Sequence, residues 1–269
     1  MTMLEIRGFS KFFMIHHLRK KMQAVKDMNF SVEKGEFLGI VGRSGSGKST
    51  ILKSIYRTYF PDKGEILYDS ARFGKIDLAK AKEREIIYLR KYEIGYVSQF
   101  LNVMPRVTSR ELVENSLLEI GVSYETAKER AEEALNHFEL DEKLWDAYPN
   151  TFSGGEKLRL NIAIATVKNP RLLLLDEPTA SLDANSKVKV REMIEKLKAS
   201  GTTLIGIFHD LEFMEGLCDN VFNMQTAKME VFNESVNGIG FLEQKHSGSH
   251  EKSSDVKVLN MERQDANIF

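Results

Sequence analysis

A glycine-rich segment near the N-terminus has the residue types that are needed to bind a polyphosphate. It runs from Gly42 to Thr50 and fits the pattern G-x-x-x-x-G-K-[S/T], known as a P-loop. Glycine allows close approach of the backbone, so that N–H groups of the turn can face phosphate oxygens. Lys48 would reach the β- and γ-phosphates, and the Ser49 hydroxyl would bind Mg²⁺. The members of the segment are Gly42, Arg43, Ser44, Gly45, Ser46, Gly47, Lys48, Ser49 and Thr50.

A second element could supply metal and acid–base chemistry. The apolar run 172–175 ends in two carboxylates, Asp176 and Glu177, followed by Pro178. With a P-loop upstream, Asp176 would hold the Mg²⁺ that bridges the phosphates, and Glu177 would orient and polarise an attacking water. The alternative is a buried strand that simply meets a polar turn. The P-loop favours the chemical interpretation, so the pair predicts hydrolysis of a nucleoside triphosphate.

Three further elements are each weak evidence of a functional site on their own. Their order along the chain supports a functional role. The run S-G-G-E at Ser153–Glu156 precedes an apolar helix and would form a second anion site, although such a run is more often a flexible turn. Gln99 ends an expected strand between the two phosphate elements. His209 follows another apolar strand, where a lone histidine is usually structural.

The elements that position these residues follow from apolar periodicity. Runs bounded by turn residues predict strands at 3–9, 24–41, 65–69, 94–99, 172–175 and 203–208. Helical spacing predicts helices at 48–59, 78–90, 108–146, 158–167 and 184–199. The block 108–146 is interrupted at Gly121, and a second helix within it runs from about Tyr124 to His137. Apolar strands separated by helices predict a mainly parallel sheet covered on both faces. The block 108–146 would form a separate lobe beside this sheet.

Length and composition limit the class of protein. The 269 residues suit one large domain plus an appendage, and hydrophobic residues at 42% are enough for a sizeable core. A net charge of −1 gives no general attraction to nucleic acid or anionic lipid. No apolar run approaches the ~18–20 residues that span a bilayer, and no signal peptide begins the chain. The single cysteine, Cys218, excludes an internal disulfide and a cysteine-built metal site.

These observations predict a cytoplasmic protein without a nucleic-acid partner and without direct membrane insertion. Any membrane association would come through a partner. Residues 233–269 are polar and lack a core pattern, so we expect a weakly ordered tail after a folded unit of residues 1–232.

The order of the motifs resembles the ATP-binding-cassette (ABC) ATPases over about residues 3–230. The resemblance implies an α/β P-loop NTPase fold of ABC type, with a mainly parallel sheet core, an antiparallel β subdomain and an α-helical subdomain at about 100–150. The matching motifs are Walker A at Gly42–Thr50, the Q-loop at Gln99, the signature at Ser153, Gly154, Gly155 and Glu156, Walker B at Leu172–Glu177, the D-loop at Ser181, Leu182 and Asp183, and the switch histidine at His209.

The resemblance also implies roles for single residues. Phe13 matches the aromatic side chain that stacks on adenine, and Asp183 joins the nucleotide-binding residues. Gln99 joins Ser49 and Asp176 at the Mg²⁺ ion, and Glu177 and His209 are the catalytic pair. In the family, ATP on one subunit's P-loop is closed off by the signature of an opposing subunit, so dimerisation with a second ABC subunit, identical or related, is implied.

A narrower resemblance is to the PhnL group of the bacterial carbon–phosphorus lyase system. The segments that resemble it are 59–66, 95–101, 104–106, 151–156, 174–183 and 205–210. That group works with the other lyase subunits in phosphonate degradation, where it assists formation of α-D-ribose 1-methylphosphonate 5-triphosphate. Two departures are Ile164, where arginine is expected, and Lys157-Leu158-Arg159, in place of a glutamine-rich stretch. Both departures lie on the helix after the signature and not on the phosphate-contacting loop. They therefore bear on pairing with a partner subunit more than on ATP binding.

Two other functions use the same residues. The first is the nucleotide-binding subunit of a membrane ABC transporter, of importer or lipoprotein-release type, whose partner is a membrane permease. The second is a scaffold that binds ATP without turning it over. The presence of both Glu177 and His209 argues against the scaffold.

Overall fold

The strands that carry the predicted motifs belong to one six-stranded sheet. Its order is β10-β9-β3-β8-β7-β6, and all strands except β10 run parallel. The bounds are β3 Phe37–Val41, β6 Ile94–Val97, β7 Leu172–Asp176, β8 Thr203–Ile207, β9 Asn220–Asn223 and β10 Lys228–Val231. Strands β3, β7 and β8 are buried along their whole length, as parallel strands covered on both faces must be. The carboxyl ends of these strands meet at one edge of the sheet, where the motifs lie.

The structure is a computed structural model that describes residues 1–15, 20–101, 106–180, 182–208 and 210–232. The expected tail at 233–269 lies outside the described residues. No helix in the described ranges is long and apolar enough to cross a membrane.

The leucines of β7 show how one strand serves two cores. Leu173 and Leu175 belong to a buried cluster with the helices on one face of the sheet, whereas Leu172 and Leu174 belong to a second cluster on the other face. Successive side chains of a strand point to opposite faces, so an unbroken leucine run fits this position. The two cores hold Asp176 rigidly at the end of β7.

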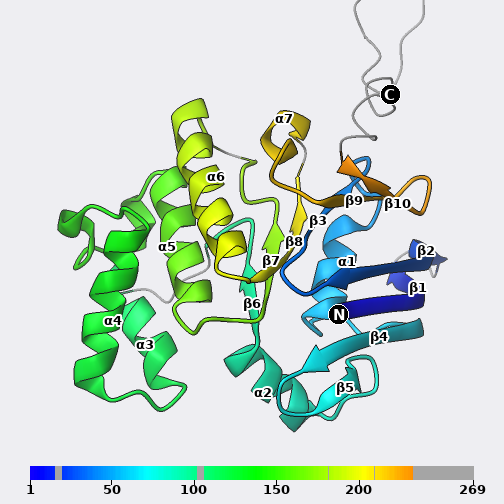
Figure 1. The fold of residues 1–269 in the computed structure, drawn as a ribbon, viewed down its shortest axis with the longest axis horizontal. Coiled ribbons are helices and arrows are strands. Elements are labelled where there is room, and N and C mark those ends of the chain that lie inside the picture. The colour runs from blue at the N-terminus through cyan, green and yellow to red at the C-terminus, as the bar shows by residue number, and fades with distance from the viewer. Residues whose placement is uncertain (16–19, 102–105, 181, 209, 233–269) are drawn as a thin grey trace, which may run out of the picture.

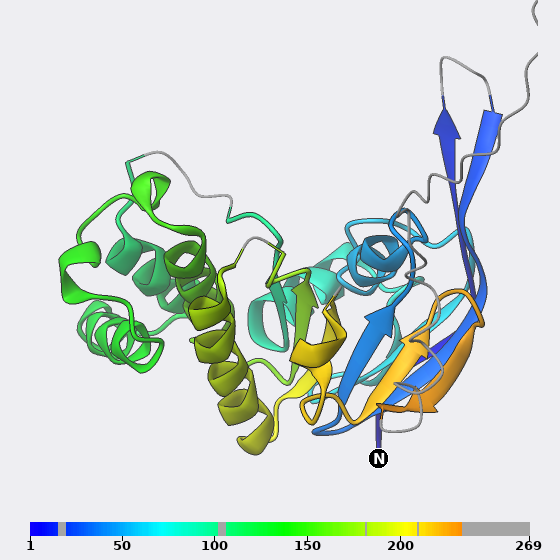
Figure 2. The same ribbon diagram turned by 90° about the horizontal axis from the view of Figure 1, so that it is seen from above.

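A second, antiparallel sheet confirms the expected β subdomain. Its order is β2-β1-β4-β5. The bounds are β1 Thr2–Ile15, β2 Lys20–Glu33, β4 Lys63–Ser70 and β5 Gly74–Asp77. In Figure 2 the β1–β2 pair extends away from the body of the molecule. Helix α1, Lys48–Ile55, buries Ile51, Leu52 and Ile55 in the core that both sheets share.

The remaining helices lie mainly on the other side of the parallel sheet. In the part of the chain that the structure describes, they are α3 Ser109–Leu118, α4 Tyr124–His137, α5 Gly154–Thr166 and α6 Ala184–Ala199, with the short α7 Leu211–Met214 and the 3₁₀ helices Glu142–Leu144 and Pro149–Thr151. Helix α2, Glu83–Tyr92, packs on β6 and buries Ile86 and Leu89 in the core that both sheets share. Figure 1 shows α5 and α6 against the sheet, with α3 and α4 beyond them.

The helical block differs in one respect from the prediction. It does lie beside the sheet, but Val113 of α3 and Leu135 of α4 share one buried cluster with Leu160 of α5 and with the sheet. Two short amphipathic helices have too little apolar surface for a core of their own, so α5 completes it. The block is therefore continuous with the main core.

The end of α1 and the start of α2 also differ from the prediction, and a single arginine explains both. Helix α1 ends at Ile55 and not near residue 59, and Arg57 has a left-handed φ of 66°. Its guanidinium donates to the Leu78 carbonyl at 2.7 Å and to those of Ala79 and Ala81. Because these carbonyls accept hydrogen bonds from Arg57, they do not form the first turn of a helix. The next helix therefore starts at Glu83 and not at Leu78.

Candidate active site

The P-loop lies between β3 and α1, as the sequence predicts. Gly47 precedes the first residue of α1 with a φ of 94°, and a Cβ there would lie 2.5 Å from the Ala24 carbonyl oxygen of β2. Only glycine fits this position, because both the backbone angle and the contact exclude a side chain. The turn is thus pressed against β2 and presents its backbone amides at the start of α1, where an anion is favoured.

Lys48 is directed back over the loop that precedes it. Its ammonium donates to the carbonyl oxygens of Gly42 at 2.9 Å and Arg43 at 3.1 Å, and the residue is only 4% exposed. Burial lowers the pKa of Lys48, while the carboxylates of Glu177 and Asp176 act in the opposite direction. The charge is therefore held close to the loop backbone, within reach of a phosphate bound there.

Ser49 and Asp176 meet although 127 residues separate them. The Ser49 hydroxyl donates to Oδ1 of Asp176 at 2.8 Å. The Tyr96 hydroxyl donates to the other carboxylate oxygen, Oδ2, at 2.6 Å. Burial and this hydrogen bond raise the pKa of Tyr96, so the phenol stays protonated and donates. Sequence reasoning missed Tyr96, which the alignment of β6 beside β7 brings to Asp176.

The oxygens of Ser49 and Asp176 fit a Mg²⁺ ion. A hydroxyl and a carboxylate are hard oxygen ligands, and Mg²⁺ is usually bound through one or two such groups plus phosphates and water. Among the residues that the structure describes, no group of three or more His, Cys, Asp or Glu side chains could hold a metal ion. A cation here would thus take its remaining ligands from water and from the phosphates of a nucleotide bound at the adjacent P-loop.

Gln99 and Glu177 are also brought together. Nε2 of Gln99 donates to Oε2 of Glu177 at 3.3 Å. This contact leaves the amide oxygen of Gln99 as the atom for the metal role predicted from the resemblance. Glu177 has a left-handed φ of 52°, which is uncommon for a residue other than glycine and is often found at functional sites.

Phe13 lines the same pocket as the P-loop. This pocket of about 240 Å³ is formed by Phe13, Ala24, Gly45, Lys48, Ser49 and Glu177 among others. Tyr59 packs edge-on against the Phe13 ring, with ring centroids 5.2 Å apart and planes at 77°. The aromatic ring, the phosphate-binding turn and Glu177 therefore surround one space, which supports the predicted place of the adenine.

The signature residues do not line that pocket. Ser153 caps α5: its hydroxyl accepts from the Glu156 backbone N–H at 3.3 Å, and Glu156 accepts from the Ser153 N–H at 2.7 Å. Ser153 and Gly154 are exposed, whereas Gly155 is buried against Ser186. The structure leaves the N-terminus of α5 open to solvent, away from the chain's own P-loop.

The D-loop and switch predictions are only partly covered. Asp183 caps α6 by accepting from the Ser186 N–H at 2.9 Å, and these hydrogen bonds lower its pKa. It does not line the P-loop pocket. Ser181 and His209 lie outside the described residues, so the catalytic role of His209 stays a prediction. Asp210, which follows His209 in the sequence, forms a 2.6 Å ion pair with Lys187 of α6.

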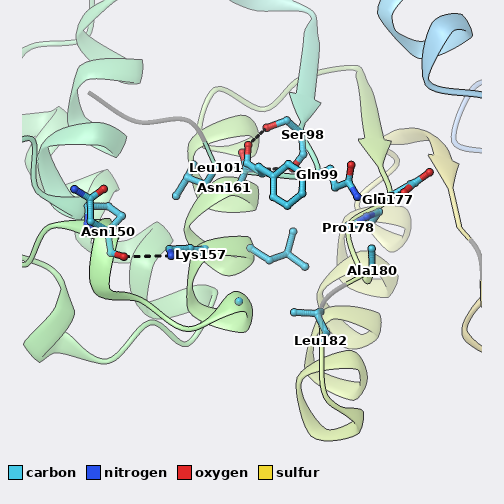
Figure 3. Close-up of a pocket in the computed structure, with 14 residues that line it drawn as sticks. Ser98, Gln99, Leu101, Asn150, Lys157, Asn161, Glu177, Pro178, Ala180 and Leu182 are labelled. Atoms are coloured by element: carbon cyan, nitrogen blue, oxygen red, sulfur yellow. Dashed lines mark hydrogen bonds between the residues drawn. The ribbon is translucent and has the colours of Figure 1, made fainter. Parts of the chain in front are cut away.

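A second, larger pocket lies between Gly154 of the signature and Glu177. It measures about 440 Å³ and is lined by Gln99, Phe100, Gly154, Lys157, Asn161 and Glu177 among others (Figure 3). Asn161 of α5 is 7% exposed and donates to the Ser98 carbonyl at 2.9 Å. Sequence reasoning missed this residue, since a buried asparagine on an apolar helix gives no sign of its partner.

A mainly parallel sheet with a P-loop after β3 and a carboxylate pair at the end of β7 defines a P-loop nucleoside triphosphatase. The family model described as "ABC transporter" matches residues 25–180. The chain belongs to the ABC family and is an ABC ATPase, with an ABC-type fold of mixed sheet, antiparallel β subdomain and helical subdomain.

Several relatives cover most of the chain. The chain is 37% identical over 211 residues to a putative hemin import ATP-binding protein, HrtA, of Staphylococcus haemolyticus, covering 78% of this chain and 91% of the relative. It is 35% identical over 204 residues to the cell division ATP-binding protein FtsE of Bacillus subtilis, covering 76% of this chain and 86% of FtsE.

Solved structures agree in fold. The ATP-binding cassette MJ0796 of Methanocaldococcus jannaschii, solved as a dimer in a post-hydrolysis state with ADP and Pi, is 30% identical at a TM-score of 0.78. The match covers 86% of this chain and 99% of MJ0796. The protein cbiO1 of Clostridium perfringens, part of the transporter complex cbiONQ, is 26% identical at a TM-score of 0.73, covering 89% and 92%.

Proposed function

We propose that this chain is the ATP-hydrolysing subunit of a membrane ABC transporter and works as a dimer beside a permease. The observation that supports this most is the set of relatives. They include the ATP-binding proteins HrtA, of putative hemin import, and FtsE, of cell division, together with a component of cbiONQ. A macrolide export ATP-binding/permease protein of Campylobacter jejuni also matches, over 28% of its own length. These names favour the transporter alternative over the carbon–phosphorus lyase.

The open P-loop pocket supports a dimer. It is lined by Phe13, the P-loop and Glu177, with no contribution from Ser153–Glu156. The exposed N-terminus of α5 would instead face the nucleotide of a second copy or a related ATPase. MJ0796, which resembles this chain over almost its whole length, is a dimer. Each ATP would then lie between one chain's P-loop and the other chain's signature.

The chain's own residues have distinct parts in the proposed hydrolysis. The P-loop amides bind the phosphates, Phe13 stacks on the base, and Lys48 exchanges its carbonyl partners for phosphate oxygens. Ser49 and Asp176, with the Gln99 amide oxygen, would hold Mg²⁺, which neutralises charge on the phosphate oxygens when it is bound.

The Glu177 carboxylate is proposed to orient the attacking water and take its proton, with His209 as the second catalytic residue. Oε2 of Glu177 accepts from Gln99, so the side chain is held beside the larger pocket, which both residues line. Signature closure by the opposing subunit would exclude other water, so that hydrolysis follows dimer formation.

The carbon–phosphorus lyase remains the second candidate, on one observation. The segments 95–101 and 205–210 around Gln99 and His209 are more distinctive than generic ABC motifs and resemble the PhnL group. In that case the partners would be the other lyase subunits, and ATP hydrolysis would drive the multi-subunit complex without performing the C–P cleavage.

One experiment separates the two candidates. The tagged full chain is purified from its own cells after detergent extraction and mild cross-linking, and co-purified proteins are identified by mass spectrometry. Recovery of a polytopic membrane protein in an ATP-sensitive complex supports the transporter. Recovery of phosphonate-processing enzymes, together with loss of growth on a phosphonate as sole phosphorus source when the gene is deleted, overturns it in favour of the lyase.

A further inference from the structure

We propose that Asn161 is a positioning residue for ATP hydrolysis, which holds the backbone at Ser98 and thereby sets Gln99 against Glu177. The inference rests on the proposed role of Glu177 in hydrolysis. It concerns a residue on α5, the helix that begins at the signature, and three residues at the ends of β6 and β7.

The first contact joins the helix to the strand end. Nδ2 of Asn161 donates to the Ser98 carbonyl oxygen at 2.9 Å, across 63 residues of sequence, as Figure 3 shows. Asn161 is 7% exposed and lies between the fully buried Leu160 and Ile162. A polar side chain in this setting is costly without a partner, so its amide is held firmly on Ser98.

The second contact reaches the acidic pair from the next residue along the chain. Gln99 follows Ser98 directly, and its Nε2 lies 3.3 Å from Oε2 of Glu177. Both side chains line the pocket in Figure 3. Moving the Ser98 backbone by a fraction of an ångström would move the Gln99 side chain and change its contact with Glu177.

The backbone at Ser98 needs an outside support because the strand ladder stops before it. The pairing of β6 with β7 ends at Val97 and Leu175. Beyond that point the Ser98 hydroxyl donates to the Phe100 carbonyl at 2.6 Å, which closes a local turn. Phe100 itself is 65% exposed. The Asn161 amide thus ties a segment that has left the sheet to the rigid core helix.

The position of Asn161 on α5 adds a functional reason. The helix starts at Gly154, so Asn161 lies about 10 Å along its axis at 1.5 Å per residue. The same rigid helix therefore carries the signature at its exposed end and supports the Gln99 segment along its length. A tilt of α5 when the signature meets an opposing nucleotide would reach Glu177 through Asn161, Ser98 and Gln99.

The test compares Asn161→Leu and Asn161→Asp with a matched control. Leucine keeps the side-chain size without a donor, and aspartate keeps the shape but replaces the donor by an acceptor. Both variants should lower kcat for ATP about tenfold or more while KM and ATP affinity change less than about twofold, because only the hydrolytic step is misaligned. The control is Thr166→Val: Thr166 is buried on α5, and its hydroxyl donates only to Ile162 of the same helix at 2.7 Å.

A double-mutant cycle tests whether Asn161 acts through Gln99. Asn161→Leu should lower kcat little further in the Gln99→Ala background, since the side chain that Asn161 positions is already absent.

The control variant Thr166→Val should match wild type in kcat and lose a similar amount of thermal stability to Asn161→Leu. If Asn161→Leu does not fold, Asn161→Asp provides the same comparison.

Two results overturn the inference alone. One is a wild-type kcat in a folded Asn161→Asp protein while Glu177→Gln is inactive, which removes Asn161 and leaves the role of Glu177 intact. The other is a full, additive loss from Asn161→Leu in the Gln99→Ala background. If Glu177→Gln itself hydrolyses ATP at the wild-type rate, the proposed site is wrong and this inference is wrong with it.

Discussion

The Tyr96 hydroxyl lies 2.6 Å from Oδ2 of Asp176, so both oxygens of this carboxylate are held by protein hydroxyls. The other oxygen, Oδ1, accepts from Ser49 at 2.8 Å. Asp176 is 5% exposed. With Oδ2 taken by Tyr96, the carboxylate cannot rotate freely, and Oδ1 is directed to the P-loop helix, where the Mg²⁺ of a bound nucleotide would lie.

Tyr96→Phe should therefore raise the Mg²⁺ concentration needed for nucleotide binding and hydrolysis, by roughly tenfold on the scale of outer-shell contacts at metal sites. ATP binding without divalent cation should not change, because the P-loop is untouched. Mn²⁺ binding in the presence of ATP, followed by electron paramagnetic resonance, measures the cation directly. Tyr92→Phe, at the partly exposed end of α2, is the matched control. An unchanged Mn²⁺ affinity in Tyr96→Phe would show that the hydroxyl does not orient Asp176.

Glu177→Gln and Lys48→Ala should separate hydrolysis from binding. Loss of the Glu177 carboxylate should lower kcat by about a hundredfold or more and leave ATP affinity intact, so that an ATP-bound dimer accumulates. Loss of the Lys48 ammonium should weaken ATP binding itself. Calorimetry gives the affinities, and light scattering during size-exclusion chromatography gives the oligomeric state. Undiminished turnover in Glu177→Gln would contradict the role of Glu177 in hydrolysis. Unchanged ATP affinity in Lys48→Ala would contradict the role of Lys48 in ATP binding.

The parts of the fold and site that sequence predicts are local. The P-loop needs a strand, a turn and a helix start within one short segment, and β3, Gly47 and α1 supply them in order. Helix α6 matches its prediction, 184–199, because its cap Asp183 and its apolar face are both local signals. Ser49 and Asp176 were predicted to share one ion, and the structure places their oxygens together.

The missed parts depend on distant partners or weak signals. Strand β9 offers only Val221 and Phe222 between two asparagines, too short a pattern to distinguish from a loop. Tyr96 reaches Asp176 only because β6 and β7 pair in one register, with Tyr96 opposite Leu174. The partner of Asn161 is likewise set by the packing of α5 on the sheet, which helical periodicity does not specify.

Gly155 should not tolerate a side chain, because α5 and α6 approach closely there. A Cβ at Gly155 would lie 2.8 Å from Oγ of Ser186. Gly155→Ala should therefore cost about 1–3 kcal/mol of stability or tilt α5 and reduce ATP hydrolysis, with ATP affinity at the P-loop retained. Ser186→Gly in the same chain removes the clashing atom and should restore part of the loss. Gly155→Ala with wild-type stability and turnover would rule out this steric account.

Cys218 should be unreactive in the folded protein. The residue is 6% exposed, and burial raises the pKa of its thiol to about 12. The thiolate is the reactive form, so very little is available at neutral pH. A thiol reagent such as Ellman's reagent should find no thiol in the native chain and one after denaturation, in line with the single cysteine of the sequence. Rapid labelling of the native chain would mean that the α7–β9 region opens readily.

Lys187 and Asp210 should make a small, pH-dependent contribution to stability. The hydrogen bond from Lys187 lowers the pKa of Asp210 below its ordinary value of 3.8. A carboxylate with a lowered folded-state pKa contributes stability above its unfolded pKa and loses it as the pH falls through the folded one. Lys187→Met should therefore cost about 1 kcal/mol or less at neutral pH, and the difference from wild type should shrink below about pH 4. Urea unfolding at a series of pH values measures it, with Lys189→Met of the more exposed Lys189–Glu139 pair for comparison. A difference that stays constant down to the acid limit would show that Lys187 acts through packing and not through its charge.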